Sequence, residues 1–346
     1  MTNTSNPSSK RVLVTGGGGF LGRYLVDRLL KQGRKVSILG RRVHSDLEAR
    51  GVPLIRADLG DRDEVMAACA GCSVVYHTAA LAGIWGKRSD FERTNVEGTR
   101  NVLDGCRRHG VAKLIHTSTP SVVFSGGDLR GADESQPYGE RFLCHYAETK
   151  ARAEREVLEA NGKGGLRTVA LRPHLIWGVG DNHLIPRVVA RARSGRLRMV
   201  GDGKNRVDII HVENAADGHL LAESALDKPG KTDGKAYFLS DGEPVELWPW
   251  INGLLGRLGL PPVEKRISPA AAYRAGAVCE GLWKTLFLPG EPPMTRFLAV
   301  ELAKDHFLDI TAARRDLGYE PRKPMDEGLA ELAAWLKKSD SSAARG

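Results

Sequence analysis

The sequence is poor in cysteine and has no long apolar run. It contains 5 cysteines, an odd and scattered set that is typical of reduced thiols in a cytosolic protein. Cys69 and Cys72 form an isolated CxxC without a second pair or a histidine cluster, so we expect a structural role and no bound metal. No apolar run approaches the roughly 18 residues that cross a membrane. We therefore expect a cytoplasmic protein with at most peripheral membrane contact.

Aromatic residues and acidic charge are also scarce. Aromatics make up 6% of the chain, and the basic stretches carry no pattern of aromatic side chains that would stack on bases, so we expect no nucleic-acid partner. Lys and Arg number 51 against 42 acidic residues, which gives a net charge of +9. This excess favours anionic ligands such as phosphorylated cofactors and carboxylates, although a basic soluble surface explains it equally well.

Most of the remaining sequence alternates between strand and helix patterns. Residues 1–9 are small and polar, and we expect a disordered tail rather than a signal peptide. From residue 11, apolar β-branched runs alternate with segments of helical periodicity, which predicts a parallel sheet covered on both faces. We expect strands at 11–15, 35–39, 52–55, 73–76, 111–117 and 166–171, helices at 20–32, 61–70, 91–109 and 146–160, and a loop at 125–140.

The regular alternation of strand and helix patterns changes after Pro173. Short strands near 197–200, 207–210 and 236–240 alternate with helical patterns at 184–194, 213–226, 246–258 and 270–287. The expected fold class is therefore α/β. A doubly wound, Rossmann-type parallel sheet occupies residues 10–175, and a smaller, mostly helical C-terminal substrate lobe occupies 176–346. The boundary stays open, because some of the later strands can return to the first sheet.

A glycine cluster after the first strand predicts a dinucleotide-binding loop. Gly16, Gly19 and Gly22 have the spacing GxxGxxG, which permits a tight turn and a close approach of the backbone to a pyrophosphate at the helix N-terminus. Adjacent glycines can also form a flexible linker, but the flanking strand and helix favour cofactor binding. We expect Phe20 and Leu21, which begin the helix, to contribute to the same site.

The second strand ends without the acid that usually binds the adenosine ribose of NAD. Arg41 and Arg42 stand there instead, which favours NADP(H) over NAD(H), with an exposed basic turn as the alternative. After the third strand, Asp58 and Leu59 occupy the position where an acid contacts adenine in such folds. Capping of the following helix by Asp58 is the competing interpretation.

Tyr146 and Lys150 are the catalytic candidates. In the sequence Tyr-Ala-Glu-Thr-Lys the two side chains lie about one helical turn apart, on one face. A nearby ammonium stabilises a phenolate and lowers the tyrosine pKa from its usual value of ~10. Tyr319 and Lys323 repeat the spacing, but Pro321 argues against a helix there. That second pair is therefore a negative control.

Two hydroxyl groups follow the fifth strand. Ser118 and Thr119 stand directly after it, at the carboxyl edge of the sheet where ligands bind in such folds. A hydroxyl there can hold a substrate carbonyl oxygen beside Tyr146. The sequence leaves the choice between the two open.

Together these motifs resemble the extended short-chain dehydrogenase/reductase superfamily, and more narrowly the 3β-hydroxysteroid dehydrogenase family. The stretches that carry the narrower resemblance are 116–124 (HTSTPSVVF), 146–150 (YAETK), 171–178 (LRPHLIWG), 201–208 (GDGKNRVD) and 211–214 (HVEN). Two branches of the family compete. Residues 121–126 and 172–174 resemble sterol-4α-carboxylate 3-dehydrogenases. Residues 82–86 and 288–298 resemble the 2-alkyl-3-oxoalkanoate reductases of olefin biosynthesis, and this second branch is favoured.

The resemblance implies an NAD(P)-dependent oxidoreductase that interconverts a secondary alcohol and a ketone. Tyr146 would be the general acid/base, and Lys150 would tune it and bind the ribose. Thr119 would take the place of the family's usual serine. A non-catalytic cofactor-binding regulatory module is a minor alternative, since such modules often lose the tyrosine or the lysine and this chain keeps both.

Further cofactor contacts follow from the same resemblance. The glycine motif would hold the pyrophosphate. His77, Ala79 and Ala80 would line the cofactor, Asn95 would support the catalytic lysine, and Pro173 would approach the nicotinamide amide.

The implied substrate is a hydrophobic small molecule that bears a carboxylate or a sterol ring. A cation is expected near the carboxylate, and Lys87, Arg88, His174 and His183 are unranked candidates. The apolar segment 270–288 is interpreted as a cover over the pocket, as a peripheral membrane foot, or as an ordinary packed helix. A homodimer is compatible with these features.

Overall fold

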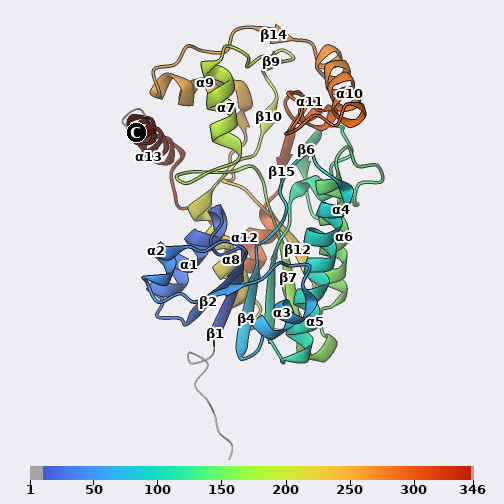
Figure 1. Ribbon diagram of the computed structural model, residues 1–346, viewed down its shortest axis with the longest axis vertical. Coiled ribbons are helices and arrows are strands. Elements are labelled where there is room, and N and C mark those ends of the chain that lie inside the picture. The colour runs from blue at the N-terminus through green and yellow to red at the C-terminus, as the bar shows by residue number, and fades with distance from the viewer. Residues whose placement is uncertain (1–10, 344–346) are drawn as a thin grey trace, which may run out of the picture.

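A seven-stranded parallel sheet forms the centre of the larger lobe (Figure 1). The computed structural model describes residues 11–343, and side chains for 11–340; the tail expected at 1–9 lies outside the described residues. The strand order is β12-β7-β5-β4-β1-β2-β3. The strands are β1 Arg11–Thr15, β2 Val36–Gly40, β3 Leu54–Arg56, β4 Cys72–His77, β5 Lys113–Thr117, β7 Arg167–Pro173 and β12 Lys235–Leu239.

Helices cover both faces of this sheet, as the sequence predicts for a doubly wound, Rossmann-type fold. Along β1, Val12 and Val14 enter the core on one face and Leu13 enters the core on the other, as is usual for parallel strands buried on both sides. Cys69 and Cys72 are free thiols buried in the second of these cores. One face carries α1 Phe20–Lys31, α8 Val212–Ala225 and α12 Thr311–Leu317, and the other carries α3 Arg62–Ala68, α5 Gly98–Arg108 and α6 His145–Glu159.

A smaller lobe lies beyond the carboxyl ends of the strands, at the top of Figure 1. Its core contains three tryptophans, Trp177, Trp248 and Trp250. Its helices are α7 Leu184–Arg193, α9 Leu247–Arg257, α10 Pro269–Thr285, α11 Arg296–Glu301 and α13 Met325–Ala343. Its strands are β6 Leu129–Ala132, β8 Ile176–Trp177, β9 Met199–Val200, β10 Arg206–Val207, β11 Ile210–His211, β13 Val245–Glu246, β14 Arg266–Ile267 and β15 His306–Leu308.

The two lobes exchange segments of the chain. β12 pairs with β7 at the edge of the large sheet, and α8 and α12 pack on that sheet, although all three come from residues 176–346. In the other direction, β6 lies inside the loop predicted at 125–140 and pairs with β15 in the small lobe. The loop prediction is wrong for these four residues, because such a short strand depends on a partner far along the chain and carries no local signal.

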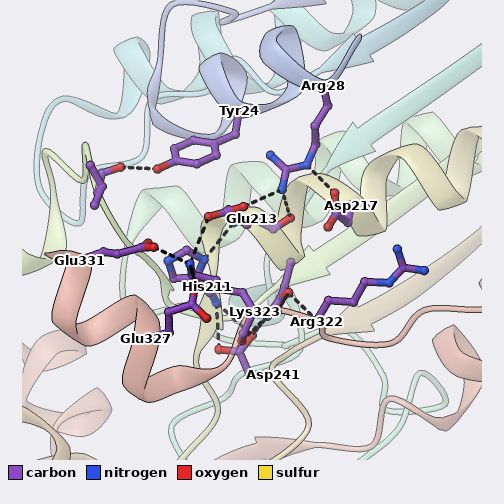
Figure 2. A network of polar contacts seen from close by, with 12 residues as sticks. Tyr24, Arg28, His211, Glu213, Asp217, Asp241, Arg322, Lys323, Glu327 and Glu331 are labelled. Carbon is purple, nitrogen blue, oxygen red and sulfur yellow. Dashed lines mark hydrogen bonds and ion pairs between the residues drawn. The ribbon is translucent and has the colours of Figure 1, made fainter. Parts of the chain in front are cut away.

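A polar network joins α13 to the helices of the large lobe (Figure 2). Lys323, just before α13, forms ion pairs with Glu327 and Glu331. Figure 2 also shows Arg28 of α1 bonded to Asp217 and Glu213 of α8. The Lys323 Nζ lies 2.7 Å from Glu331 and 3.9 Å from Glu213, so the lysine ammonium offsets part of the negative charge of these carboxylates.

A buried ion pair fixes α6 against the sheet. Arg172 of β7 donates from Nε to Glu154 Oε2 of α6 at 3.0 Å and from Nη2 to Oε1 at 2.5 Å. The two side chains are 4% and 0% exposed, and Tyr138 donates a further hydrogen bond to the same carboxylate at 2.7 Å. Two-point contact in a dry environment fixes both the position and the rotation of the helix.

Replacement of Arg172 by methionine is expected to lower the free energy of unfolding by about 3–5 kcal/mol, because it leaves a buried carboxylate without its partner. The matched control is Arg100→Met. Arg100 binds Glu156 on the same helix, but its side chain is 52% exposed, so we expect a cost of about 1 kcal/mol or less. Urea unfolding followed by circular dichroism measures both. Equal costs would contradict a special role for the buried pair.

Candidate active site

One cleft runs along the carboxyl edge of the large sheet, between the two lobes. Its volume is about 580 Å³, which suits a cofactor-sized ligand. The wall includes the glycine loop, the residues that follow β2, β3, β4 and β5, the start of α6, and segments 173–176 and 181–183. Phe297 and Glu301 of α11 close the side that belongs to the small lobe. Phe297 lies in the stretch 288–298 that resembles the reductase branch, but neither residue was predicted to line the site.

The glycine loop allows a bound ligand to approach its backbone closely. Gly16 has a φ of +69°, and a Cβ there would lie 2.9 Å from the backbone of Ala79. A Cβ on Gly22 would lie 2.1 Å from the Gly16 carbonyl oxygen. The first turn of α1 carries no acidic residue, and Gly19 offers no side-chain cap, which leaves its N–H groups available to an anion. These features fit the pyrophosphate of a dinucleotide.

The predicted loop residues differ in where they lie. Gly16, Gly19, Phe20 and Leu21 line the cleft. Gly22 is not part of the cleft wall among the described residues, and its role is the close contact between loop and helix.

Arg41, Arg42, Asp58 and Leu59 gather at the far end of the cleft. Arg41 is exposed and lies 3.7 Å from the Asp58 carboxylate. Asp58 accepts a hydrogen bond from the backbone of Gly60 and does not cap α3. The cap is Asp61, which accepts from Glu64 N.

His44 also lines this end of the cleft and was not predicted from the sequence. A Cβ on Gly18 would meet the His44 ring at 1.8 Å, so the imidazole lies directly against the glycine loop. Its Nδ1 lies 3.2 Å from Arg23 Nη2. His44 follows β2 outside any motif, which explains why its sequence position gave no signal.

Tyr146 and Thr119 meet at the opposite end. Tyr146 is the second residue of α6, and Thr119 lines the cleft with it, its Oγ1 bonded to Ser121. Burial raises the pKa of Tyr146 to about 12, and the interaction with the Thr119 side chain offsets only part of this. Ser118 lines the cleft as well, but its hydroxyl is buried and unpaired among the described residues. Thr119 is therefore the hydroxyl beside the phenol.

Lys150 lies one turn further along α6 and also lines the cleft. Its ammonium donates to Thr117 O at 2.6 Å and to His116 Nε2 at 3.1 Å. Burial lowers the pKa of Lys150 to about 7. Burial and the lysine charge hold the pKa of His116 well below its usual value, so its neutral ring accepts the hydrogen bond.

This arrangement departs from the sequence expectation in one respect. The hydrogen bonds of Lys150 go to the end of β5 and not to the phenol, and the pKa of Tyr146 is raised, not lowered. The physical reason is burial, which disfavours the charged form of each group. His116 was missed because helical spacing does not reveal what lies beneath a helix.

His77 and Asn95 lie beneath the cleft wall. The His77 ring bridges Thr15 Oγ1 at 2.7 Å and Thr99 Oγ1 at 3.0 Å, and burial lowers the pKa of His77 to about 3. His77 therefore joins β4 to its neighbours and, contrary to the prediction, does not line the cleft. Ala79 and Ala80 line the cleft, as predicted.

Asn95 clamps the loop that follows β4. Its side chain accepts from Leu81 N at 2.8 Å and donates to Leu81 O at 3.2 Å and to Thr149 Oγ1 at 3.1 Å. It contacts α6 beside the lysine, not the lysine itself. The single helix predicted at 91–109 is divided in the structure. A π-helical stretch, Glu92–Glu97, lies between α4 (Arg88–Phe91) and α5. Such stretches often mark functional sites.

The four candidate cations separate clearly. His174 and His183 line the cleft, as does Pro173. Lys87 and Arg88 do not: both are exposed, and Arg88 is paired with Glu148 at 2.6 Å. The two histidines are therefore the candidates that remain.

Segment 270–288 does not cover the cleft. No residue of α10 lines it, and the apolar side chains Val278, Leu282, Leu286 and Phe287 are exposed. Within residues 11–343, no helix combines the length and apolar character that crossing a bilayer demands. The control pair Tyr319 and Lys323 lies between α12 and α13, outside a helix and away from the cleft.

Comparisons with known proteins agree with this geometry. The model of the 3-beta hydroxysteroid dehydrogenase/isomerase family matches residues 13–268. A 2-alkyl-3-oxoalkanoate reductase of Stenotrophomonas maltophilia is 49% identical over 94% of this chain and 98% of its own length. A protein of the same name from Shewanella oneidensis is 45% identical over 93% and 85%. The decarboxylating sterol-4-alpha-carboxylate 3-dehydrogenase of Mus musculus is 33% identical over 93% and 89%.

A solved structure of MoeE5 in complex with UDP-glucose and NAD is similar to the whole fold. Its TM-score is 0.73 at 26% identity, over 95% of this chain and 99% of that chain. The chain thus belongs to the 3-beta hydroxysteroid dehydrogenase/isomerase family and is an NAD(P)-dependent oxidoreductase that acts on hydroxyl or keto carbons.

Proposed function

We propose that the protein is an NADP(H)-preferring 2-alkyl-3-oxoalkanoate reductase, whose substrate is a hydrophobic β-keto acid. The observation that carries the proposal is the placement of Tyr146, Thr119 and Lys150 on the same cleft as the glycine loop. The relatives named for this activity at 49% and 45% identity support the substrate class. A sterol-4α-carboxylate dehydrogenase is the second candidate, supported by the relative at 33% identity.

The proposed chemistry is reduction of the keto group. Bound NAD(P)H supplies the hydride. Tyr146 donates its phenolic proton to the keto oxygen as a general acid, and its raised pKa favours the protonated form that this role requires at neutral pH. Thr119 donates a hydrogen bond to the same oxygen. Lys150 binds the cofactor ribose and, when protonated, stabilises the phenolate that remains.

The proposed preference for NADP(H) rests on Arg41 and Arg42. Both line the adenosine end of the cleft, and Arg41 is largely solvent-exposed. Two guanidinium groups can bind a 2′-phosphate through charge-assisted hydrogen bonds. The gain applies to NADPH alone, because NADH has a hydroxyl at that position.

Replacement of Tyr146 by phenylalanine is expected to lower kcat by about 100- to 10,000-fold, the usual contribution of a general acid, while NADPH binding is retained. Tyr319→Phe is the matched control, because it removes a buried hydroxyl bonded to Ser240 O outside the cleft. Nicotinamide absorbance reports turnover, and quenching of protein fluorescence reports binding. Retained turnover would contradict the catalytic role, and lost binding would show that the phenol serves the cofactor instead.

The double replacement of Arg41 and Arg42 by alanine is expected to weaken NADPH binding by about 10- to 100-fold, the value of one or two charge-assisted contacts, with little change for NADH. Lys35→Ala is the charge control, because this exposed lysine precedes β2 at its opposite end. Fluorescence titration gives the dissociation constants of NADPH and NADH for the natural protein, the double variant and the control. Equal losses for the two cofactors would reject the phosphate-binding role.

A paired turnover assay tests the substrate. One arm offers a long-chain 2-alkyl-3-hydroxy acid, and the other offers a 3β-hydroxysteroid and its 4α-carboxylated form, each with NADP and with NAD. We expect activity in the first arm, with NADP preferred. Activity in the second arm alone would replace the proposed function by the sterol candidate.

A further inference from the structure

Two buried histidines and a glutamate form a hydrogen-bonded chain behind the substrate side of the cleft. His174 directly follows β7, His306 begins β15, and Glu301 ends α11. His174 Nε2 lies 2.6 Å from His306 Nδ1, and His306 Nε2 lies 2.8 Å from the main-chain oxygen of Glu301. His174 is 6% exposed and His306 is 3% exposed. None of the three is used by the hydride chemistry described above.

The hydrogen bonds determine where the protons lie. A main-chain oxygen can only accept, so His306 Nε2 carries a hydrogen. In the neutral form of His306, Nδ1 then has only its lone pair. The partner at 2.6 Å, His174 Nε2, is therefore the donor. It follows that neutral His174 presents a lone pair at Nδ1.

His174 Nδ1 is open to the cleft. The residue lines the cleft beside Pro173, and within residues 11–340 the side-chain partner of its ring is His306, which is bonded to Nε2. Nδ1 is thus the ring nitrogen that is left for a ligand. Burial and the neighbouring His306 hold the pKa of His174 well below its usual value. Burial therefore favours the neutral ring, and an anion bound at Nδ1 would favour its protonation.

The remainder of the chain can stabilise such a charge. The Glu301 carboxylate lies 3.7 Å from His306 Nε2. Burial raises the pKa of Glu301, but a charge on His306 opposes this rise and so favours the carboxylate. The carboxylates of Asp208 and Asp305 also face His306 and interact with it. The titratable groups that share the cleft wall with His174 are Tyr146, Lys150, Asp181, His183 and Glu301 at the reaction end and Arg41, Arg42, His44 and Asp58 at the adenosine end. The Cys144 thiol interacts with Glu301.

His183 is the weaker candidate for an anion. The buried carboxylate of Asp181 accepts from the backbone of His183 at 2.7 Å and from Leu184 and Ile185. An anion beside His183 would therefore meet a fixed negative charge. His174 has no such carboxylate among its hydrogen-bond partners in the described part of the chain.

We propose that His174 binds the carboxylate of the substrate and takes up a proton as the acid binds, with His306 as its positioning residue and Glu301 as the countercharge. This inference rests on the proposed function, because it assigns the part of the cleft that binds the carboxylate of the proposed substrate. One proton passes from solvent to His174 Nδ1, and no other bond changes. A ketone that has lost its carboxylate cannot stabilise the imidazolium, so the cleft discriminates against the decarboxylated product of its own substrate.

The experiment separates binding from turnover. A 2-alkyl fatty acid without the 3-oxygen cannot react, so calorimetric titration in two buffers of different ionisation enthalpy measures its affinity and the protons taken up. Its primary amide is the neutral control. For the natural protein we expect up to one proton per acid, an affinity that falls by up to about tenfold per pH unit as pH rises, and no uptake with the amide.

Two replacements of His174 test the assignment, with His109→Gln and His183→Gln for comparison. His174→Gln keeps a group that can bond to His306 but cannot become charged. It is expected to bind the acid about 10- to 100-fold more weakly, without proton uptake, and to bind the amide and NADPH as before. His174→Asn, whose amide lies nearer the Nδ1 position, should keep part of the acid affinity without its pH dependence. His109→Gln, at the exposed end of α5, is the control.

The outcomes distinguish this inference from the proposed function. Proton uptake that persists in His174→Gln, or a loss of acid binding in His183→Gln instead, would overturn the inference. An equal loss for the acid and the amide would also overturn it. Proton-coupled binding of the acid, combined with no turnover of a 2-alkyl-3-hydroxy acid, would reject the proposed function and support the carboxylate site.

Discussion

The buried contact between Glu154 and Arg172 is the constraint on which the reaction end of the cleft depends. Tyr146, Lys150 and Glu154 follow one another at intervals of four residues, so they form a single row on the inner face of α6. Glu154 fixes one end of this row to β7 through two hydrogen bonds in a dry environment. The position of the phenol at the other end is thus set two turns away from the cleft.

The middle of the row adds a second attachment. Lys150 donates to the carbonyl of Thr117 at the end of β5, and Asn95 reaches α6 through Thr149. Glu154 also raises the pKa of Lys150, against the larger effect of burial. One helix is therefore positioned by β5, β7 and the π-helical stretch together, and its first turn has little freedom to move away from Thr119.

Much of this could be predicted from local sequence. Three features depend on residues that are close together in the chain: the glycine loop, the Tyr-xxx-Lys helix and the positions of the first six strands along the chain. The pairing of β6 with β15 could not be predicted, because neither strand forms without the other. The same holds for the contact between His174 and His306, which comes from that pairing. The sequence indicated His174 as one of four cations, and only the structure separates it from Arg88.

The cleft changes in electrical character along its length. At the adenosine end, the guanidinium of Arg41 is exposed to solvent, as suits a phosphate that carries its own charge. At the reaction end, burial opposes the charged forms of three groups: it raises the pKa of Tyr146 and lowers those of Lys150 and His174. A dry wall favours an apolar substrate, and a charge on one of these three groups is stabilised there by a bound partner. Burial, which the small lobe completes through α11, therefore serves both the binding of a hydrophobic chain and the control of its protons.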